Sequence, residues 1–201
     1  LVSFAVTVAD AKKLISPEFK KAGSKVVLVK PELTKLGLPE KESQKRIFAL
    51  VNKLAEDGTI CSAYTPGFGG IAEAVTKMSF GNAIGVKLDS KLTADELFSK
   101  KYGAFVVETD GILRFGKKIG TTLDKYTIIY NRRHIKLSKL EKAWEAKLEG
   151  VYPSNTVLQP VKDVENISYD FKGTRPSPLI KTASPKVIIP VFPGTNCEYD
   201  V

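Results

Sequence analysis

The prolines of this chain confine its folded core to the first three quarters of the sequence. Seven of the 11 prolines follow residue 150. Proline lacks a backbone N–H and interrupts both helix interiors and central strands. Residues 151–185 are also polar and weakly periodic, so we expect an extended linker there. Residues 1–150, by contrast, have the length of one ordinary domain.

The charge of the chain changes at the same point. Residues 1–150 hold 26 basic and 17 acidic residues, whereas residues 151–201 hold five of each, so the net charge of +9 belongs to the first segment. A basic domain suits anionic partners such as nucleic acids, nucleotides or phosphorylated metabolites. A lysine-rich surface also serves solubility alone, so the charge does not choose among these interpretations.

The apolar pattern of residues 1–150 predicts strands and helices in a mixed order. Short β-branched or aromatic runs predict strands at residues 2–8, 25–30, 59–64, 83–88, 103–109, 126–130 and 134–137. The helical spacing of apolar residues predicts helices over residues 40–56 and 70–78. Capping boxes predict two more helices, one that starts at Thr93 and one that runs from Ser138 to Gly150. Tight turns favour an α+β fold: a largely antiparallel, mixed sheet with helices on one side.

A glycine-rich loop joins an expected strand to an expected helix at residues 65–70. Glycines let a backbone approach a ligand closely, and free N–H groups at a helix start attract phosphate. The candidate nucleotide- or phosphate-binding residues are therefore Thr65, Gly67, Phe68, Gly69 and Gly70. Tight turns also need glycine for purely structural reasons. The loop matches neither the dinucleotide-binding glycine pattern nor a P-loop.

Few side chains of this sequence could carry reaction chemistry. Cys61 and Cys197 form no C-x-x-C pair, so we expect no disulfide framework, no zinc site and a reducing, cytoplasmic compartment. Cys197 has no base to activate it, since the sole histidine, His134, lies in another expected domain. Cys61 is expected to be a small buried hydrophobic residue. We therefore expect no catalytic residue. We also expect no metal site, because the candidate carboxylates are scattered along the sequence and form no metal-binding motif: Asp10, Glu73, Glu108 and Asp110. No apolar run approaches membrane-spanning length.

The glycine loop and its surroundings resemble a known family. Residues 61–88, which run from Cys61 through the loop to Met78 and an apolar strand, closely resemble the C-terminal ATP-binding-type domain of phosphoribosylformylglycinamidine synthase, a member of the aminoimidazole ribonucleotide synthetase-like superfamily. The resemblance extends over residues 2–30 and to Ala143-Trp144-Glu145 before Tyr152-Pro153. Residues 190–200 resemble the opening strand and loop of the glutaminase domain that follows in the single-chain form.

This resemblance implies three segments and an internal fragment of a longer chain. Residues 1–150 would be the synthetase-related C-terminal-type domain and residues 151–185 the linker. Residues 186–201 would be the first strand and loop of a truncated class I glutamine amidotransferase domain. The chain opens at Leu1 rather than at a methionine, which agrees with an internal start.

The resemblance also implies an activity for the parent protein. The family is an ATP-dependent ligase of de novo purine synthesis, which converts formylglycinamide ribonucleotide to its amidine with ammonia from glutamine. The implied cofactors are ATP and Mg²⁺, and the implied partners are the remaining parent domains, formylglycinamide ribonucleotide and glutamine. Many family members have His-Asp where this chain has Tyr64-Thr65, which puts a metal role of this loop in doubt. Without its partner domains the fragment is expected to be inactive.

Two alternatives stay open beside this hypothesis. The first is a basic nucleic-acid-binding α+β module, although aromatic residues interleaved with Lys and Arg on a strand are missing. The second is another ATP-dependent enzyme of the same superfamily, such as a thiamine-phosphate or selenophosphate enzyme. Residues 193–200 argue against the second, because those enzymes lack a fused glutaminase.

Overall fold

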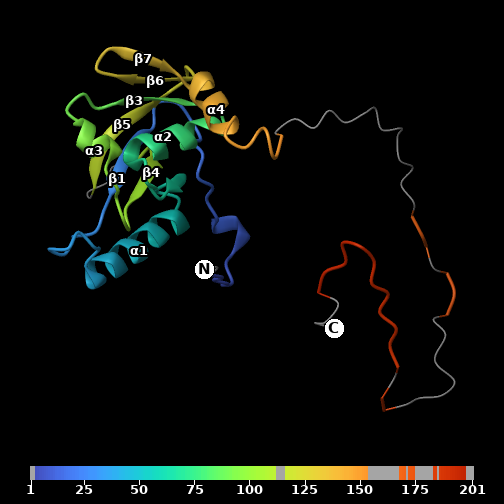
Figure 1. Cartoon of the computed structure of the whole chain (residues 1–201). Coiled ribbons are helices and arrows are strands. Elements are labelled where there is room, and N and C mark those ends of the chain that lie inside the picture. Colours follow the sequence, from blue (N-terminus) through green and yellow to red (C-terminus); the bar gives the residue numbers. More distant parts are fainter. Residues whose placement is uncertain are drawn as a thin grey trace. The chain divides into compact units, whose positions relative to one another are not determined.

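A computed structural model describes residues 3–111, 116–153, 168–170, 172–174, 183–184 and 186–197 (Figure 1). The chain divides into two units, Leu1–Thr156 and Val157–Val201. Among the described residues, every helix and strand belongs to the first unit. The predicted linker falls mostly outside the described residues.

A seven-stranded mixed sheet forms the first unit. Its strands are β1 (Lys25–Val29), β2 (Ser62–Tyr64), β3 (Gly85–Leu88), β4 (Phe105–Thr109), β5 (Lys117–Leu123), β6 (Thr127–Tyr130) and β7 (Arg133–Lys136). The spatial order is β2-β4-β1-β5-β3-β6-β7. Only the β3–β6 pair is parallel, while the other pairs are antiparallel. The predicted α+β class and mixed, largely antiparallel sheet are confirmed.

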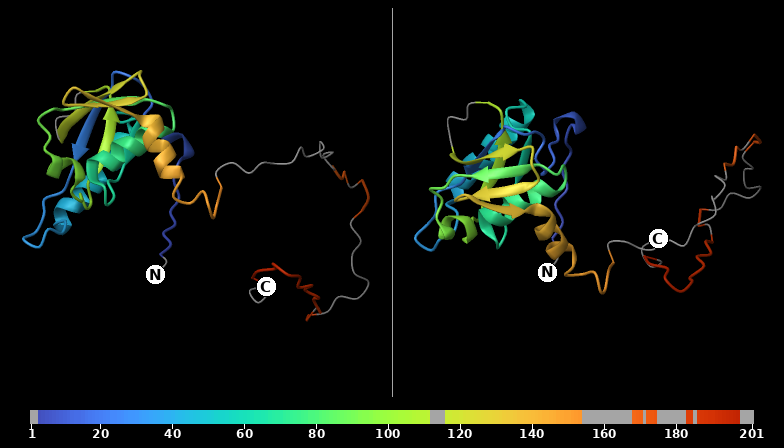
Figure 2. Two further views of the ribbon diagram at one scale, coloured as in Figure 1. Left: turned by 45° about the horizontal axis from the view of Figure 1, so that its top comes forward. Right: turned by 90° about the horizontal axis from the view of Figure 1, so that it is seen from above.

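Helices cover both faces of this sheet. The helices are α1 (Lys41–Glu56), α2 (Gly70–Phe80), α3 (Ala94–Phe98) and α4 (Leu137–Glu145). Alternate residues of a strand face opposite sides, and Val26 and Leu28 of β1 join the apolar cluster of α2, whereas Val27 and Val29 join that of α1. The structure thus differs from the expected one-sided arrangement, because an apolar run on both faces of β1 needs two covering layers (Figure 1, Figure 2).

One of the two predicted capping boxes forms. At α3, the Thr93 hydroxyl accepts from the Glu96 N–H and the Glu96 carboxylate accepts from the Thr93 N–H. At α4, the box predicted from Ser138 is wrong, because the helix already begins at Leu137, which is completely buried. Glu141, the expected partner of Ser138, instead accepts a 2.9 Å hydrogen bond from the Tyr126 hydroxyl. Burial of an apolar anchor decides this helix start more than the capping pattern does.

The observed strands differ from the predicted ones in three places. Strand β5 lies at the centre of the sheet but has no counterpart among the predicted strands. Residues 3–8 form no strand, and Phe4, Val6 and Val8 are more than nine-tenths exposed. Residues 186–197 of the second unit also form no hydrogen-bonded strand within the described part of that unit. A strand is completed only by a neighbouring strand, so an apolar alternating pattern is not sufficient to form one.

Candidate functional site

The five candidate residues lie together on the turn between β2 and α2. The strand ends at Tyr64 and the helix begins at Gly70, so Thr65, Gly67, Phe68 and Gly69 span the connection. Thr65 and Phe68 are exposed, whereas Gly70 is buried. Gly69 is the N-cap of α2, and the helix start has no side-chain cap from the N-cap residue. The predicted strand–glycine loop–helix arrangement is confirmed, while its role in binding stays a prediction.

Gly70 is required by the fold itself. Its φ angle of +65° lies in the left-handed region, which residues with a Cβ rarely adopt. A Cβ there would lie 2.6 Å from the carbonyl oxygens of Leu97 and Ser99. The close backbone approach that this glycine permits is therefore an approach to α3 within the same domain.

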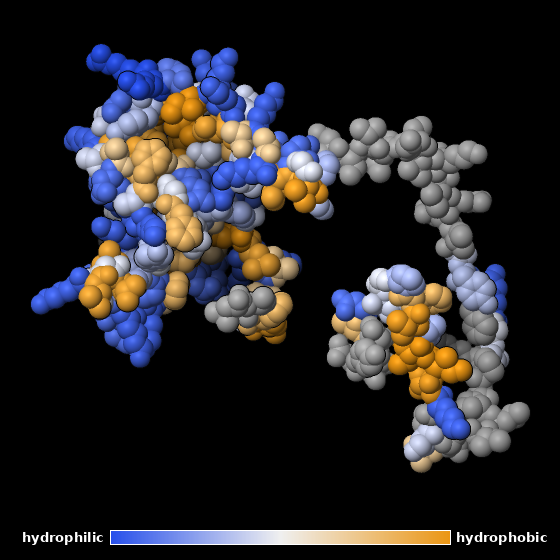
Figure 3. All heavy atoms as spheres, in the orientation of Figure 1, coloured by the Kyte–Doolittle hydropathy of each residue, from blue (hydrophilic) through white to orange (hydrophobic). Residues whose placement is uncertain are grey.

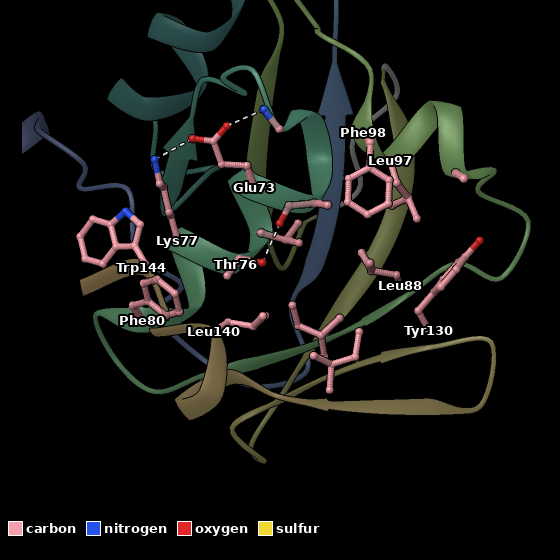
Figure 4. A pocket seen from close by; sticks show the side chains of 16 residues that line it. Glu73, Thr76, Lys77, Phe80, Leu88, Leu97, Phe98, Tyr130, Leu140 and Trp144 are labelled. Carbon is pink, nitrogen blue, oxygen red and sulfur yellow. Dashed lines mark hydrogen bonds and ion pairs between the residues drawn. The ribbon is translucent and has the colours of Figure 1, made fainter. Parts of the chain in front are cut away.

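The carboxylate of Glu73 closes over the loop from the first turn of α2. Its Oε2 accepts a 2.8 Å hydrogen bond from the Gly69 N–H, and its Oε1 lies 2.6 Å from Nζ of Lys77 (Figure 4). The Lys77 ammonium and the Gly69 N–H together hold the pKa of Glu73 below its usual range. The ion pair with Glu73 in turn raises the pKa of Lys77. Both groups are therefore charged at neutral pH.

Glu73 occupies the position that an incoming anion would need. A helix N-terminus attracts negative charge, and here the protein supplies that charge from its own side chain. A Cβ added at Gly67 would lie 2.8 Å from Oε2 of Glu73, and a Cβ added at Gly69 would lie 2.8 Å from the Cβ of Glu73. These two glycines thus make room for the carboxylate. In the sequence Glu73 looks like one of several scattered acids, although its place four residues after Gly69 is a usable signal.

Phe68 presents its ring at the outer side of the loop. It is 78% exposed, and Nζ of Lys100 lies 4.8 Å from the ring centroid. An ammonium over an aromatic face is a favourable contact of about 0.5–1 kcal/mol at exposed sites. The loop therefore carries an exposed aromatic ring, and Lys100, which follows α3, lies over that ring.

An apolar groove of about 480 Å³ begins at the same loop and runs between α2, α4 and the β6–β7 hairpin. Figure 4 shows the side chains around it, and Figure 3 shows orange, hydrophobic atoms among blue ones on the face of the first unit turned to the viewer. Its apolar walls include Phe80, Leu97, Phe98, Leu140 and Trp144. The ring of Trp144 packs 5.7 Å from that of Phe80 and is still 54% exposed. No catalytic arrangement of polar groups lines this groove.

Glu108, Asp110 and Cys61 hold structural positions, whereas Cys197 is exposed in the second unit. Glu108 is completely buried, and Asp110 accepts a hydrogen bond from Ser24 and pairs with Lys21. Burial raises the pKa of the Cys61 thiol to about 11, which leaves it protonated. Within the described ranges, no three His, Cys, Asp or Glu side chains are grouped so as to hold a metal ion. No helix among the described residues is long and apolar enough to cross a membrane.

Comparison with known proteins agrees with the family resemblance. No model of a protein family matches the chain. The phosphoribosylformylglycinamidine synthase subunit PurL of Lactobacillus delbrueckii subsp. bulgaricus is 29% identical over 121 residues, which cover 54% of this chain and 16% of that protein. The chain thus spans about one sixth of the length of the curated relatives it matches.

Solved structures share the fold. Thermotoga maritima PurL complexed with FGAR has a TM-score of 0.53 and 15% identity, over 65% of this chain and 30% of that one. The structure of PurLQS from the same organism has a TM-score of 0.54 and 16% identity, over 82% of this chain and 32% of that one. Identities this low show the fold alone. In sequence and in fold, the chain is similar to a segment of phosphoribosylformylglycinamidine synthase, as its glycine-loop motif predicts.

Proposed function

We propose that this chain is part of an ATP-dependent, amidine-forming ligase of de novo purine synthesis. The observation that carries the proposal is the segment 61–88, whose family-like sequence forms a strand, a glycine loop, a helix and a strand in the expected order. The sequence relatives and the fold neighbours independently support the same family. The parent reaction would convert formylglycinamide ribonucleotide, glutamine and ATP to the amidine, with ATP activating the amide oxygen and ammonia displacing phosphate.

The structural neighbours support two of these ligands. They include Thermotoga maritima PurL complexed with FGAR, with ADP and with ATP. In this chain, we propose that Thr65, Gly67, Phe68, Gly69 and Gly70 form a surface for a nucleotide or phosphate. An incoming phosphate would take the Gly69 N–H and the Lys77 ammonium from Glu73. Both donors suit a phosphate oxygen.

Mg²⁺ does not fit this loop as well as phosphate does. Hard cations prefer several carboxylate or carbonyl oxygens, whereas the loop offers the Thr65 hydroxyl and a carboxylate already held by Lys77. We therefore assign Mg²⁺ to the whole enzyme and derive no step through it here. A cytoplasmic location follows from the proposed pathway.

The remaining segments complete this proposal. Residues 1–150 would be the synthetase-related domain and residues 151–185 a linker. Residues 186–201 would be the start of a glutamine amidotransferase domain that supplies ammonia. The fold shared with PurLQS from Thermotoga maritima supports assembly with further subunits.

Replacing Glu73 with alanine is expected to raise the affinity of the loop for inorganic phosphate and for ATP about tenfold, because it removes a competing charge from the helix N-terminus. Isothermal titration calorimetry of the wild-type chain and the variant measures the change. Glu73→Gln should give a smaller gain, since its amide oxygen can still accept from the Gly69 N–H. The lowered pKa keeps the Glu73 carboxylate charged between neutral and mildly acidic pH, so titration of this group should not change the difference in that range.

Two further variants test where the anion binds. Lys77→Ala in the Glu73→Ala background should remove the gain, because the ammonium would be the main charge facing the phosphate. Glu56→Ala, at the end of α1, should leave phosphate binding at the wild-type level. Equal phosphate affinity in the wild type, Glu73→Ala and the double variant would refute the loop as the anion site.

The isolated chain is expected to show no ligase and no glutaminase activity. Its described residues include the proposed binding loop but no nucleophile with an activating base, since the Cys61 thiol is held protonated and His134 lies on β7 at the sheet edge. An assay with formylglycinamide ribonucleotide, ATP, Mg²⁺ and ammonia, read by phosphate release, tests the ligase activity. Glutamate release from glutamine tests the second activity. Turnover above a chain-free blank in either assay would contradict this expectation.

A further inference from the structure

A second cavity, of about 500 Å³, lies against a different face of α3 from the apolar groove. Ala94, Leu97 and Phe98 of this helix line the groove, whereas Asp95 and Glu96 line the second cavity. The two spaces share no lining residue, and no residue of the glycine loop 65–70 lines the second one. Cavities of this volume commonly hold small molecules. A ligand here would therefore occupy a site separate from the loop.

Much of the wall of this cavity is apolar. It is formed by core side chains at the end of β1, by two half-buried side chains of α1, by the first turn of α2 and by the residue before the cap of α3: Leu28, Val29, Ile47, Leu50, Ile71 and Leu92. Carbon surface that a ligand brings against these side chains leaves water, which is favourable by about 25 cal/mol per Å². This part of the cavity can hold the apolar portion of a ligand.

Three lysines and two acids also line the cavity: Lys30, Lys101, Lys117, Asp95 and Glu96. One lysine and one acid neutralise each other, because Nζ of Lys117 lies 2.6 Å from Oε1 of Glu96. The other oxygen of Glu96 accepts a 2.9 Å hydrogen bond from the Thr93 N–H. The Lys117 ammonium and this N–H lower the pKa of Glu96 to about 2. Glu96 is thus held charged beside Lys117 near neutral pH.

The other two lysines have no acid that neutralises them. Nζ of the half-buried Lys101 donates to the carbonyl oxygen and to the hydroxyl of Ser99, which are both uncharged. Among the described residues, neither Lys30 nor Lys101 forms an ion pair. The remaining acid, Asp95, is exposed on the first turn of α3. Ammonium groups with only neutral partners are favourable places for an anion.

The kind of charge indicates the kind of anion. Lysine binds phosphate as a point charge, whereas carboxylates are best matched by the forked side chain of arginine. None of the described residues that line the cavity is an arginine. A phosphate monoester carries close to two negative charges at neutral pH, which two ammonium groups can balance.

We propose that this cavity binds a phosphate monoester with an apolar body. Its phosphate would lie at Lys30 and Lys101, and its body would lie against the apolar side chains of α1 and β1. Formylglycinamide ribonucleotide matches the cavity less well, because its ribose and its amides are polar. This site is independent of the function proposed for the glycine loop.

1-Naphthyl phosphate, a phosphate monoester with an aromatic body, is the probe that tests this site. Isothermal titration calorimetry of the complete 201-residue chain should show that it binds at least about tenfold more tightly than inorganic phosphate, which lacks the body. It should exceed 1-naphthol, which lacks the phosphate, by a similar factor. A probe that binds no more tightly than inorganic phosphate would show that the apolar wall takes no part, and the proposal would be wrong.

Replacing each unpaired lysine with methionine removes an ammonium group and keeps most of the apolar stem. Lys30→Met and Lys101→Met should each weaken the binding of 1-naphthyl phosphate about tenfold. Binding of 1-naphthol should stay unchanged, because only the phosphate contact is lost. Lys53→Met, on the exposed face of α1 and away from the cavity, is the matched control and should bind like the wild type. Circular dichroism should show all three variants folded.

Glu73→Ala separates this cavity from the glycine loop. The loss caused by Lys101→Met should have the same size in the wild-type and Glu73→Ala backgrounds, because the two sites share no residue. An intact Lys101 effect without any effect of Glu73→Ala on inorganic phosphate would contradict the proposed loop site and support the cavity. Wild-type affinity for 1-naphthyl phosphate in both Lys30→Met and Lys101→Met would overturn the cavity site alone.

Discussion

Replacing Glu108 with alanine is expected to lower the free energy of unfolding of the first unit by about 3 kcal/mol or more. Glu108 lies on β4 and is completely buried. Its carboxylate accepts hydrogen bonds from the N–H groups of Lys20 (2.7 Å) and Lys21 (3.2 Å) and from the Ser62 hydroxyl (3.1 Å). Alanine would leave the buried Ser62 hydroxyl and the part-buried N–H groups of Lys20 and Lys21 without their acceptor, and it would also free the segment that leads into β1.

Urea unfolding followed by the fluorescence of Trp144, the single tryptophan of the chain, measures this loss. Glu108→Gln should cost less, about 2 kcal/mol, because its one carbonyl oxygen replaces only part of the acceptor set. Glu56→Ala, an exposed acid at the last position of α1, is the matched control and should stay within about 0.5 kcal/mol of wild type. A Glu108→Ala variant as stable as this control would show that the buried carboxylate does not hold the segment.

Glu108 also illustrates what the sequence could not predict. In the sequence it is one of several scattered acids, and its neighbours Lys20 and Lys21 are 88 and 87 positions away. Its importance comes from burial and from backbone donors, and neither leaves a local pattern. Glu73 differs in this respect, because its carboxylate bonds the Gly69 N–H only four residues earlier. A helix-start argument that included side chains of the first turn would have found it.

The strands show the same division between local and long-range causes. Strand β1 is apolar after Lys25 and its prediction is confirmed, because burial on both faces leaves a continuous pattern. Strand β5 escapes prediction because its sequence contains two lysines and Gly120. A Cβ at Gly120 would lie 2.7 Å from the Lys87 carbonyl oxygen of β3, so this glycine serves a close strand contact. The alternating pattern of residues 3–8 is local, but no neighbouring strand pairs with it in the described part of the first unit.

Replacing Gly70 with alanine is expected to destabilise the first unit by about 3 kcal/mol, through two separable causes. The positive φ of +65° costs a residue with a Cβ about 1 kcal/mol. The rest comes from the end of α3, where the carbonyl oxygens of Leu97 and of the C-cap Ser99 would lie 2.6 Å from the new Cβ. Backbone atoms cannot rotate aside as a side chain can, so α3 must shift.

Gly58→Ala separates the two causes of the Gly70 effect. Gly58 has a φ of +72° and nothing within 4 Å of the position of its Cβ, so it should lose only the conformational term of about 1 kcal/mol. Urea unfolding of both variants should therefore place Gly70→Ala about 2 kcal/mol below Gly58→Ala. Equal losses would mean that α3 yields easily and that the loop is free to move. In that case, the positive φ alone would explain the need for glycine at position 70.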